Sequence, residues 1–131
     1  MLGCMEIGVL GATGPAGRGL AARLADAGFD VIAGSRDEAK ASAVVDELRE
    51  RWGSRVAKLR PGTNAAAAAA RDVVVVATTW DAAIETASTH ADLLAGKVVV
   101  AMANGLRRVG RCTSTSPSSR RRTRPARGST A

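Results

Sequence analysis

Three glycines stand at a regular spacing directly after an apolar segment near the start of the chain. The segment is Ile7–Leu10, and the run Gly11–Gly17 that follows has glycine at its first, fourth and seventh positions. Such a run lets the backbone leave a strand sharply, approach an anion without an intervening Cβ, and bring a helix close to a sheet. Because N–H groups at the start of a helix bind phosphate, we predict a diphosphate-binding loop made by Gly11, Thr13, Gly14, Pro15, Ala16 and Gly17.

A second polar segment, Gly34–Arg36, follows about twenty residues after the glycine run, where dinucleotide-binding folds contact the adenosine ribose. A fold that prefers NAD has a carboxylate there for the ribose 2′-hydroxyl. Here Ser35 and Arg36 offer a hydroxyl and a guanidinium, which suit a 2′-phosphate, and Lys40 would add charge one helical turn later. Asp37 leaves an alternative open, in which its carboxylate serves a 2′-hydroxyl and pairs with Arg36 at the surface. We predict NADP as the cofactor.

Polar residues also follow two later apolar runs. The segment Thr78–Trp80 comes after Val73–Val76, and Asn104 comes after the run that ends at Met102. In a parallel sheet both positions lie at the carboxyl edge, where nicotinamide and substrate would bind. We therefore add Thr78, Thr79, Trp80 and Asn104 to the predicted contacts, although Trp80 could equally be a packing residue and Asn104 part of a turn.

No catalytic residue is assigned. The single histidine, His90, falls on an expected helix away from the strand ends, and we interpret it as a solvent-exposed helix residue. Hydride transfer depends on the position and orientation of the cofactor and needs no protein nucleophile.

Strands and helices are expected to alternate, which predicts an α/β fold with a Rossmann-type, doubly wound parallel sheet of about five strands in the order 3-2-1-4-5. The expected strands are Met5–Leu10, Phe29–Ala33, Val56–Leu59, Val73–Val76 and Lys97–Met102. The expected helices are Gly17–Ala27, Asp37–Trp52, an alanine helix capped by Thr63 or Asn64 and reaching Ala70, and Asp81–Ala95. Pro61 and Gly62 are expected to form a turn, and the last helix to face inward with Ile84, Ala87, Ala91 and Leu94.

The charge divides the 131-residue chain into two parts. Of the 19 basic residues eight lie after Leu106, whereas all 12 acidic residues lie before it, so residues 1–106 carry a net charge of −1. We expect residues 1–106 to form one NADP-binding domain. Residues 107–131 are mostly Arg, Ser, Thr, Pro and Gly, which predicts a disordered basic tail. Specific nucleic-acid binding is not expected, because the folded part has no basic excess.

The two cysteines, Cys4 and Cys112, form neither a metal-binding nor a disulfide pattern. Neither a signal peptide nor an apolar run long enough for a membrane span is evident in the sequence. We expect a reduced cytoplasmic protein without a metal or a membrane partner.

The same residues resemble a known family, the coenzyme F420-dependent NADP oxidoreductases. The resemblance covers about residues 5–106 and is carried in order by Ile7–Leu20, Arg23–Ala25, Ala27–Gly28, Gly34–Arg36, Gly62–Ala65, Val73–Asp81, Leu94–Lys97 and Val98–Asn104. It implies hydride transfer between NADPH and coenzyme F420 as co-substrate. It further implies that Thr13, Ser35 and Arg36 contact NADP, and that Trp80 and Asn104 lie near the nicotinamide or the deazaflavin.

The chain departs from the family pattern at three places. The family commonly has proline before this tryptophan and after this asparagine, where the chain has Thr79 and Gly105. The family also continues into further strands and a helical region that completes the F420 pocket and the dimer, so a homodimer is an expectation for a full-length chain only. The tail composition is typical of a GC-rich gene read out of frame, and we hypothesise a frameshift within 107–111. Resequencing tests it, since a one-base change should open a family-like continuation; otherwise the tail is a genuine segment.

Three other functions stay open at this stage. The first is a Rossmann-type reductase for another small substrate, of the imine, 3-hydroxyacid or prephenate type. The second is a non-catalytic NADP-binding module. The third is a protein that contacts nucleic acid electrostatically through its tail.

Overall fold

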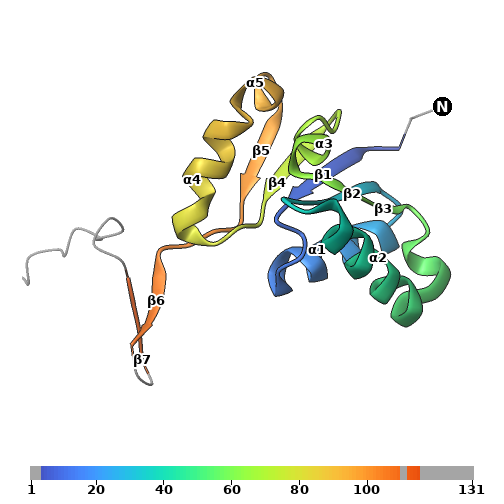
Figure 1. Ribbon diagram of the computed structural model, residues 1–131, viewed down its shortest axis with the longest axis horizontal. Coiled ribbons are helices and arrows are strands. Elements are labelled where there is room, and N and C mark those ends of the chain that lie inside the picture. Colours follow the sequence, from blue (N-terminus) through green and yellow to red (C-terminus); the bar gives the residue numbers. More distant parts are fainter. Residues whose placement is uncertain (1–3, 110–111, 116–131) are drawn as a thin grey trace, which may run out of the picture.

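The computed structural model describes residues 4–109 and 112–115 and contains a five-stranded parallel sheet (Figure 1). Its strand order, β3-β2-β1-β4-β5, confirms the predicted topology. The strands are β1 (Glu6–Leu10), β2 (Asp30–Ser35), β3 (Leu59–Thr63), β4 (Val73–Val76) and β5 (Val98–Ala101). The helices are α1 (Pro15–Asp26), α2 (Glu38–Trp52), the 3-10 helix η1 (Gly53–Val56), α3 (Asn64–Ala68), α4 (Trp80–Thr89) and α5 (Ala91–Leu94).

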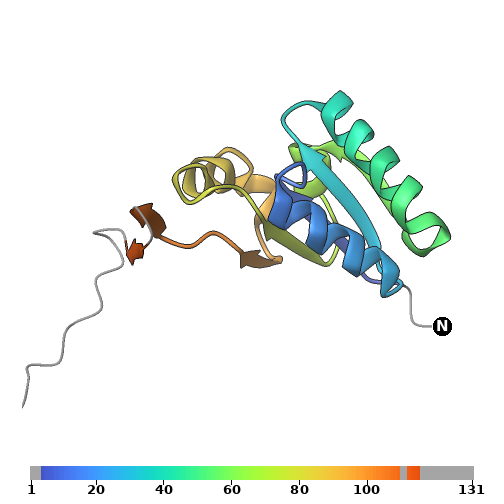
Figure 2. The same ribbon diagram turned by 90° about the horizontal axis from the view of Figure 1, so that it is seen from below.

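The helices form two layers on opposite faces of the sheet. Alternate strand residues such as Val9 and Val31 pack with α1 and α2 in one apolar cluster. The residues between them, such as Leu10 and Val74, pack with α3 and with side chains of α4 and α5 in a second cluster. α2 and α4 lie towards opposite ends of the sheet in both views (Figure 1 and Figure 2). Because β1 pairs in parallel with both β2 and β4, the carboxyl ends of these three strands lie together at one edge.

The alanine-rich helix α3 packs directly on the backbone of the sheet. A Cβ on Gly8 would overlap the carbonyl group of Ala67, and a Cβ on Gly34 would come within 2.7 Å of the Ala67 Cβ. Only small residues on both sides allow this approach, which accounts for alanine at position 67, whereas Ala65 and Ala69 are exposed. The Oγ1 atom of Thr63 accepts a hydrogen bond of 3.1 Å from the Ala66 amide, so Thr63 is the helix cap, one of the two predicted.

The third strand is displaced from its predicted position. The expected strand Val56–Leu59 is wrong except for its last residue, because Val56 ends the 3-10 helix and is fully buried there. Pro61 and Gly62 lie inside β3 and do not form the predicted turn. β3 is an edge strand that pairs only with β2, so a proline without an N–H group is tolerated in it.

The last predicted helix is divided at His90 into α4 and α5. Of the residues expected to face inward, Leu94 packs against the second cluster, but Ile84 is 75% exposed and Ala91 is exposed as well. The inward prediction is therefore wrong for these two residues. The reason is position, because α4 lies at the margin of the sheet and buries none of its residues (Figure 1).

Two further strands, β6 (Leu106–Val109) and β7 (Cys112–Thr115), form a separate antiparallel hairpin. The expectation of a tail without secondary structure from Arg107 onwards is corrected for these segments. Their pairing is local, with Val109 opposite Cys112, which is the short-range pairing of a hairpin. The hairpin lies beyond α4, apart from the main sheet, in both views. The remainder of the predicted tail, residues 110–111 and 116–131, lies outside the described residues.

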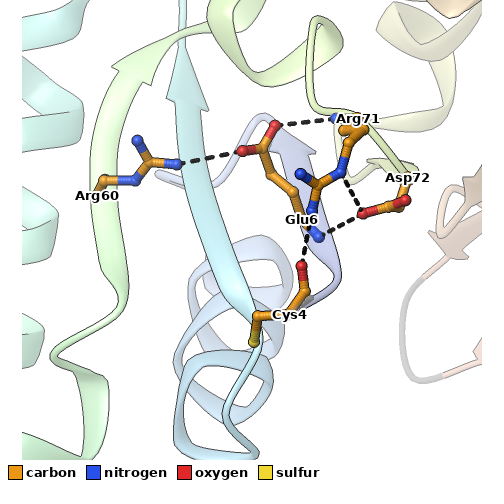
Figure 3. A network of polar contacts seen from close by, with 5 residues as sticks. All are labelled: Cys4, Glu6, Arg60, Arg71 and Asp72. Carbon is orange, nitrogen blue, oxygen red and sulfur yellow. Dashed lines mark hydrogen bonds and ion pairs between the residues drawn. The ribbon is translucent and has the colours of Figure 1, made fainter. Parts of the chain in front are cut away.

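A network of polar contacts ties together the amino-terminal ends of the strands (Figure 3). The Glu6 amide donates a hydrogen bond of 2.8 Å to the Asp72 carboxylate, and the Arg71 amide donates one of 2.9 Å to the Glu6 carboxylate. The Arg71 guanidinium donates to the Cys4 carbonyl and to Asp72, while Arg60 approaches Glu6 at 3.6 Å. The network joins β1 to β3 and to the start of β4 at the edge opposite the glycine loop.

This network predicts a pH-dependent stability. The Glu6 amide, and secondarily the Arg71 guanidinium, hold the pKa of Asp72 below its ordinary value of 3.8. Because the folded-state pKa is lowered, the stabilisation is present above pH 3.8 and is lost as the pH falls through the folded-state pKa. We expect Asp72→Asn to lower the free energy of unfolding modestly near neutral pH, and this difference to vanish on acidification. Urea unfolding between about pH 6 and about pH 2 measures it. Asp46→Asn, at an exposed position of α2, is the control, and a pH-independent difference for Asp72→Asn would contradict the expectation.

Candidate dinucleotide-binding site

A pocket of about 360 Å³ lies at the carboxyl ends of β1, β2 and β4. Its walls come from the glycine loop, the segment after β2, the start of α3 and one side of α4. Among the predicted contact residues, those that line it are Gly11, Thr13, Gly14, Ser35, Arg36, Thr78 and Thr79. The residues that line it without having been predicted are Asn64, Ala77, Ala82, Glu85, Thr86, Thr89 and His90.

The three glycines of the loop have different structural roles. Gly11 has a φ of +76°, and a Cβ there would lie 2.8 Å from a methyl group of Thr78. A Cβ on Gly17 would lie 2.7 Å from the Gly11 carbonyl oxygen, so this residue lets α1 start close to the strand. Both roles confirm the sequence interpretation. A Cβ on Gly14, by contrast, would meet only the Gly11 oxygen at 3.7 Å, so Gly14 leaves open space on the pocket side.

The first turn of α1 is suited to an anion. Gly14 is the N-cap residue and supplies no side-chain cap, Pro15 occupies the start of the helix, and the first turn contains no acidic residue. The amides of the first turn have no acceptor within the helix, and they carry the positive end of the helix dipole. The helix start therefore offers N–H donors and partial positive charge to a phosphate group.

The last residue of β2, Ser35, and the residue after it, Arg36, present a hydroxyl and a guanidinium to the same pocket. Ser35 is only 5% exposed, and its Oγ accepts a hydrogen bond of 3.2 Å from the Asp37 amide, which leaves the hydroxyl proton to be donated. Asp37 is the N-cap of α2, and its carboxylate accepts a hydrogen bond from the Ala39 amide. Asp37 does not line the pocket, and in the described part of the chain no ion pair joins it to Arg36. This arrangement favours the 2′-phosphate interpretation over the 2′-hydroxyl alternative.

Asn64 is a site residue that the sequence reasoning missed. Its side chain is 7% exposed, and Oδ1 accepts a hydrogen bond of 3.2 Å from the Gly11 amide. The contact holds the first glycine of the loop against the start of α3. The carboxyl-edge rule that selected Thr78 would have selected Asn64 as well, if the end of β3 had been predicted correctly.

The buried hydroxyl of Thr78 has no hydrogen-bond partner within the described residues. An unsatisfied buried hydroxyl is unfavourable by about 1–3 kcal/mol. Thr78 lines the pocket, but its hydroxyl oxygen is covered, so a bound ligand would satisfy it only after the side chain rotates. The donors at the helix start and the guanidinium together fit a dinucleotide phosphate.

Several predicted contacts lie outside the pocket lining. Lys40 and Asn104 are exposed, and Trp80 is 41% exposed at the start of α4. Pro15 and Ala16 are exposed in the first turn of α1. Their contact with a cofactor stays a prediction.

The interpretation of His90 requires correction. The residue is partly buried and lines the pocket, whereas a solvent-exposed position away from the strand ends was expected. Its φ of −110° and ψ of 19° end α4, and its Nδ1 lies 2.9 Å from the Thr86 carbonyl oxygen. His90 stands four residues after Thr86, so helical spacing places it on the pocket side of α4 together with Thr86 and Thr89.

Across residues 4–109 and 112–115, no cluster of three or more His, Cys, Asp or Glu side chains is arranged to hold a metal ion. Within the same ranges every helix is too short or too polar to cross a lipid bilayer.

The strand order and the glycine loop place the chain in the class of Rossmann-type domains. A model of the family "NADP oxidoreductase coenzyme F420-dependent" matches residues 6–105, and the chain belongs to this family. It is 41% identical over 96 residues to the F420-dependent NADP reductase of Methanothermobacter thermautotrophicus, covering 73% of this chain and 41% of the relative. It is 38% identical to the F420-dependent NADP reductase of Methanothermobacter marburgensis, and the match covers 73% of this chain and 43% of that relative.

One solved structure agrees with the family assignment, and a second shows the same fold. A candidate F420-dependent NADP reductase from Arthrobacter sp. FB24 superposes with a TM-score of 0.67 and 32% identity, over 88% of this chain and 52% of that one. A diketoreductase superposes with a TM-score of 0.65 and 21% identity, over 81% of this chain and 44% of the diketoreductase, and shares the fold. The chain thus spans less than half the length of the two curated relatives.

Proposed function

We propose that this chain is the NADPH-binding module of a reductase that transfers hydride between NADPH and coenzyme F420. The observation that carries the proposal is that Arg36 and the buried Ser35 line the same pocket as the glycine loop. A 2′-phosphate and a diphosphate are the two anionic groups of NADPH, and each has a matched binding element there. The names of the curated relatives support coenzyme F420 as the second substrate.

In this proposal each pocket element takes one part of the cofactor. The first turn of α1 binds the diphosphate, and Thr13 adds a hydroxyl. Arg36 and Ser35 bind the 2′-phosphate, with Lys40 adding positive charge from the first turns of α2. The Thr78 hydroxyl gains a ligand partner, while Thr79, Trp80 and Asn104 extend the site towards the nicotinamide and the hydride acceptor. Bound NADPH supplies the hydride, and the protein orients it.

The organisation of the whole protein is part of the same proposal. Residues 1–106 form the NADP-binding unit and residues 107–131 a basic segment outside it. The proposed setting is the cytoplasm, and the proposed assembly of the full-length form is a homodimer.

The proposal is tested first by equilibrium binding of NADPH and NADH to the purified chain, followed by tryptophan fluorescence. Mixing the chain with NADPH and oxidised F420 then measures hydride transfer through loss of the deazaflavin absorption band. Binding followed by transfer is the expected result. NADPH binding without transfer to F420 would favour the non-catalytic module, and turnover of an imine, 3-hydroxyacid or prephenate-type substrate would favour another reductase. Failure to bind NADPH would overturn the proposal.

Gly14→Ala is expected to separate cofactor binding from folding. Gly14 has φ −75° and ψ 162°, which any residue adopts, and its Cβ would meet only one atom at 3.7 Å. The fold should therefore persist, while the methyl group occupies the space needed by the diphosphate. We expect NADPH affinity to fall on the order of 10- to 100-fold, or about 1.4–2.8 kcal/mol. Gly19→Ala in the same helix is the control. A Cβ there would meet no packing neighbour within 4 Å, so this variant should bind NADPH as tightly as the parent chain. A Gly14→Ala protein that binds as tightly as the parent would place the diphosphate elsewhere.

A further inference from the structure

Helix α4 presents its polar side to the pocket. The pocket wall is formed by Ala82, Glu85, Thr86 and Thr89, whose spacing places them along one side of the helix. The apolar Ile84, in contrast, is 75% exposed, and no residue of α4 is buried. A helix that packed for stability alone would turn its apolar side inward. The polar side facing the pocket is therefore suited to a ligand.

His90 completes this wall in a defined tautomeric form. Its Nδ1 lies 2.9 Å from the carbonyl oxygen of Thr86, which can only accept a hydrogen bond. In the neutral ring Nδ1 therefore carries the proton, and Nε2 keeps its lone pair. Since Nδ1 is directed at the helix backbone, the opposite edge of the imidazole is the part available to the pocket.

We propose that His90 recognises the adenine of the dinucleotide, with Nε2 accepting a hydrogen bond from the exocyclic amino group. This inference rests on the proposed function. The 2′-phosphate belongs to the adenosine ribose, so its binding by Arg36 brings the adenine into the same pocket, where α4 forms the remaining wall. The amino group is the donor on the functional edge of adenine, whereas the ring nitrogens accept. A neutral imidazole with a free Nε2 lone pair matches that donor.

The other charged groups of the pocket agree with this assignment. The Glu85 carboxylate lies on the same wall and also only accepts hydrogen bonds, so this side of the pocket disfavours a carbonyl group. Arg36 faces the pocket from the segment after β2 and is assigned to the 2′-phosphate. An adenine should bind better than a base with oxygen in place of the amino group.

The test compares NADPH with its hypoxanthine analogue, in which a carbonyl replaces the amino group of adenine. The parent chain should bind NADPH on the order of fivefold to tenfold more tightly than the hypoxanthine analogue. The analogue loses one hydrogen bond and places its carbonyl oxygen opposite an acceptor. His90→Ala should lose most of this preference and keep only the smaller part that the Glu85 carboxylate contributes. His90→Gln, whose amide oxygen can accept from the same donor, should restore part of the preference. Ser88→Ala, at an exposed α4 position outside the pocket, should keep all of it.

The outcomes separate this inference from the proposed function. Equal affinity of the parent chain for the two nucleotides, or an unchanged preference in His90→Ala, overturns the role of His90 while NADPH binding stands. Absence of NADPH binding by the parent chain overturns both. Equal affinity of the parent chain would overturn the role of His90 without any variant, whereas a preference is assigned to His90 only by the comparison of His90→Ala with His90→Gln and Ser88→Ala.

Discussion

Replacing Arg36 by alanine is expected to abolish the preference of the chain for NADPH over NADH. A guanidinium binds a phosphate through two parallel charge-assisted hydrogen bonds, and hydrogen bonds to charged groups contribute about 1.5–3 kcal/mol. NADPH affinity should therefore fall about 10- to 150-fold. NADH affinity should change little, because NADH has no 2′-phosphate to lose. Fluorescence titrations with both nucleotides at one ionic strength measure the two affinities.

Lys40→Ala measures the smaller contribution expected of the second basic residue proposed for the 2′-phosphate. It removes the same charge from an exposed position in the first turns of α2, outside the pocket lining. If the pocket contact determines the preference, Lys40→Ala should retain most of it, because an exposed charge at a distance is screened by salt. Equal losses in the two variants would show a general effect of positive charge. A preference that survives Arg36→Ala would assign the 2′-phosphate to other residues.

Arg36→Lys gives a further distinction. Lysine keeps the charge but lacks the planar pair of donors that arginine offers to a phosphate. We expect an intermediate preference, measured by the same titrations. A full preference with lysine would mean that charge alone, without the paired geometry, determines cofactor choice.

The glycine loop and the strand order could be predicted because their signals are local. The glycine spacing of Gly11–Gly17 and the unbroken valines of Val73–Val76 specify a strand, a turn and a buried strand without reference to distant residues. The position of β3 could not be predicted in this way. The valine at 56 looks like part of a strand, but it fills the core from a 3-10 turn. Pro61 is compatible with a strand only because β3 is at the edge of the sheet, and this is a property of the assembled sheet.

Part of the candidate site could be predicted from the ends of the expected strands. The site residues whose positions depend on packing were missed. Thr78 was found because the end of β4 was recognised, and Ser35 was found although β2 runs two residues beyond its predicted end at Ala33. Asn64 was not, because the end of β3 was misplaced. His90 was missed because it was assigned to an exposed helix face, although its spacing of four residues from Thr86 places it on the pocket side of α4. Ile84 is exposed because α4 lies at the margin of the sheet, and this position could not be predicted from the sequence pattern either.

Gly8→Ala is expected to have the largest effect on folding of any substitution considered. Its Cβ would overlap the backbone carbonyl of Ala67, which cannot move without displacing α3 from β1 and β2. We expect a loss of more than about 4 kcal/mol, close to the total stability of a small domain. Gly19→Ala should have the opposite sign, because its Cβ meets no atom within 4 Å and alanine favours a helix by about 0.5–1 kcal/mol. Urea unfolding followed by circular dichroism measures both.

The contrast between Gly8 and Gly14 tests whether the two glycines are required for different reasons. Both substitutions should reduce NADPH binding, but Gly8→Ala should do so through unfolding, whereas Gly14→Ala should bind weakly while remaining folded. The difference follows from what each Cβ would meet, which is the backbone of α3 for Gly8 and open pocket for Gly14. A Gly8→Ala protein with the parent unfolding midpoint would mean that α3 does not contact β1 as described. Unfolding of Gly14→Ala would make that glycine structural and remove its loop position as support for a diphosphate site.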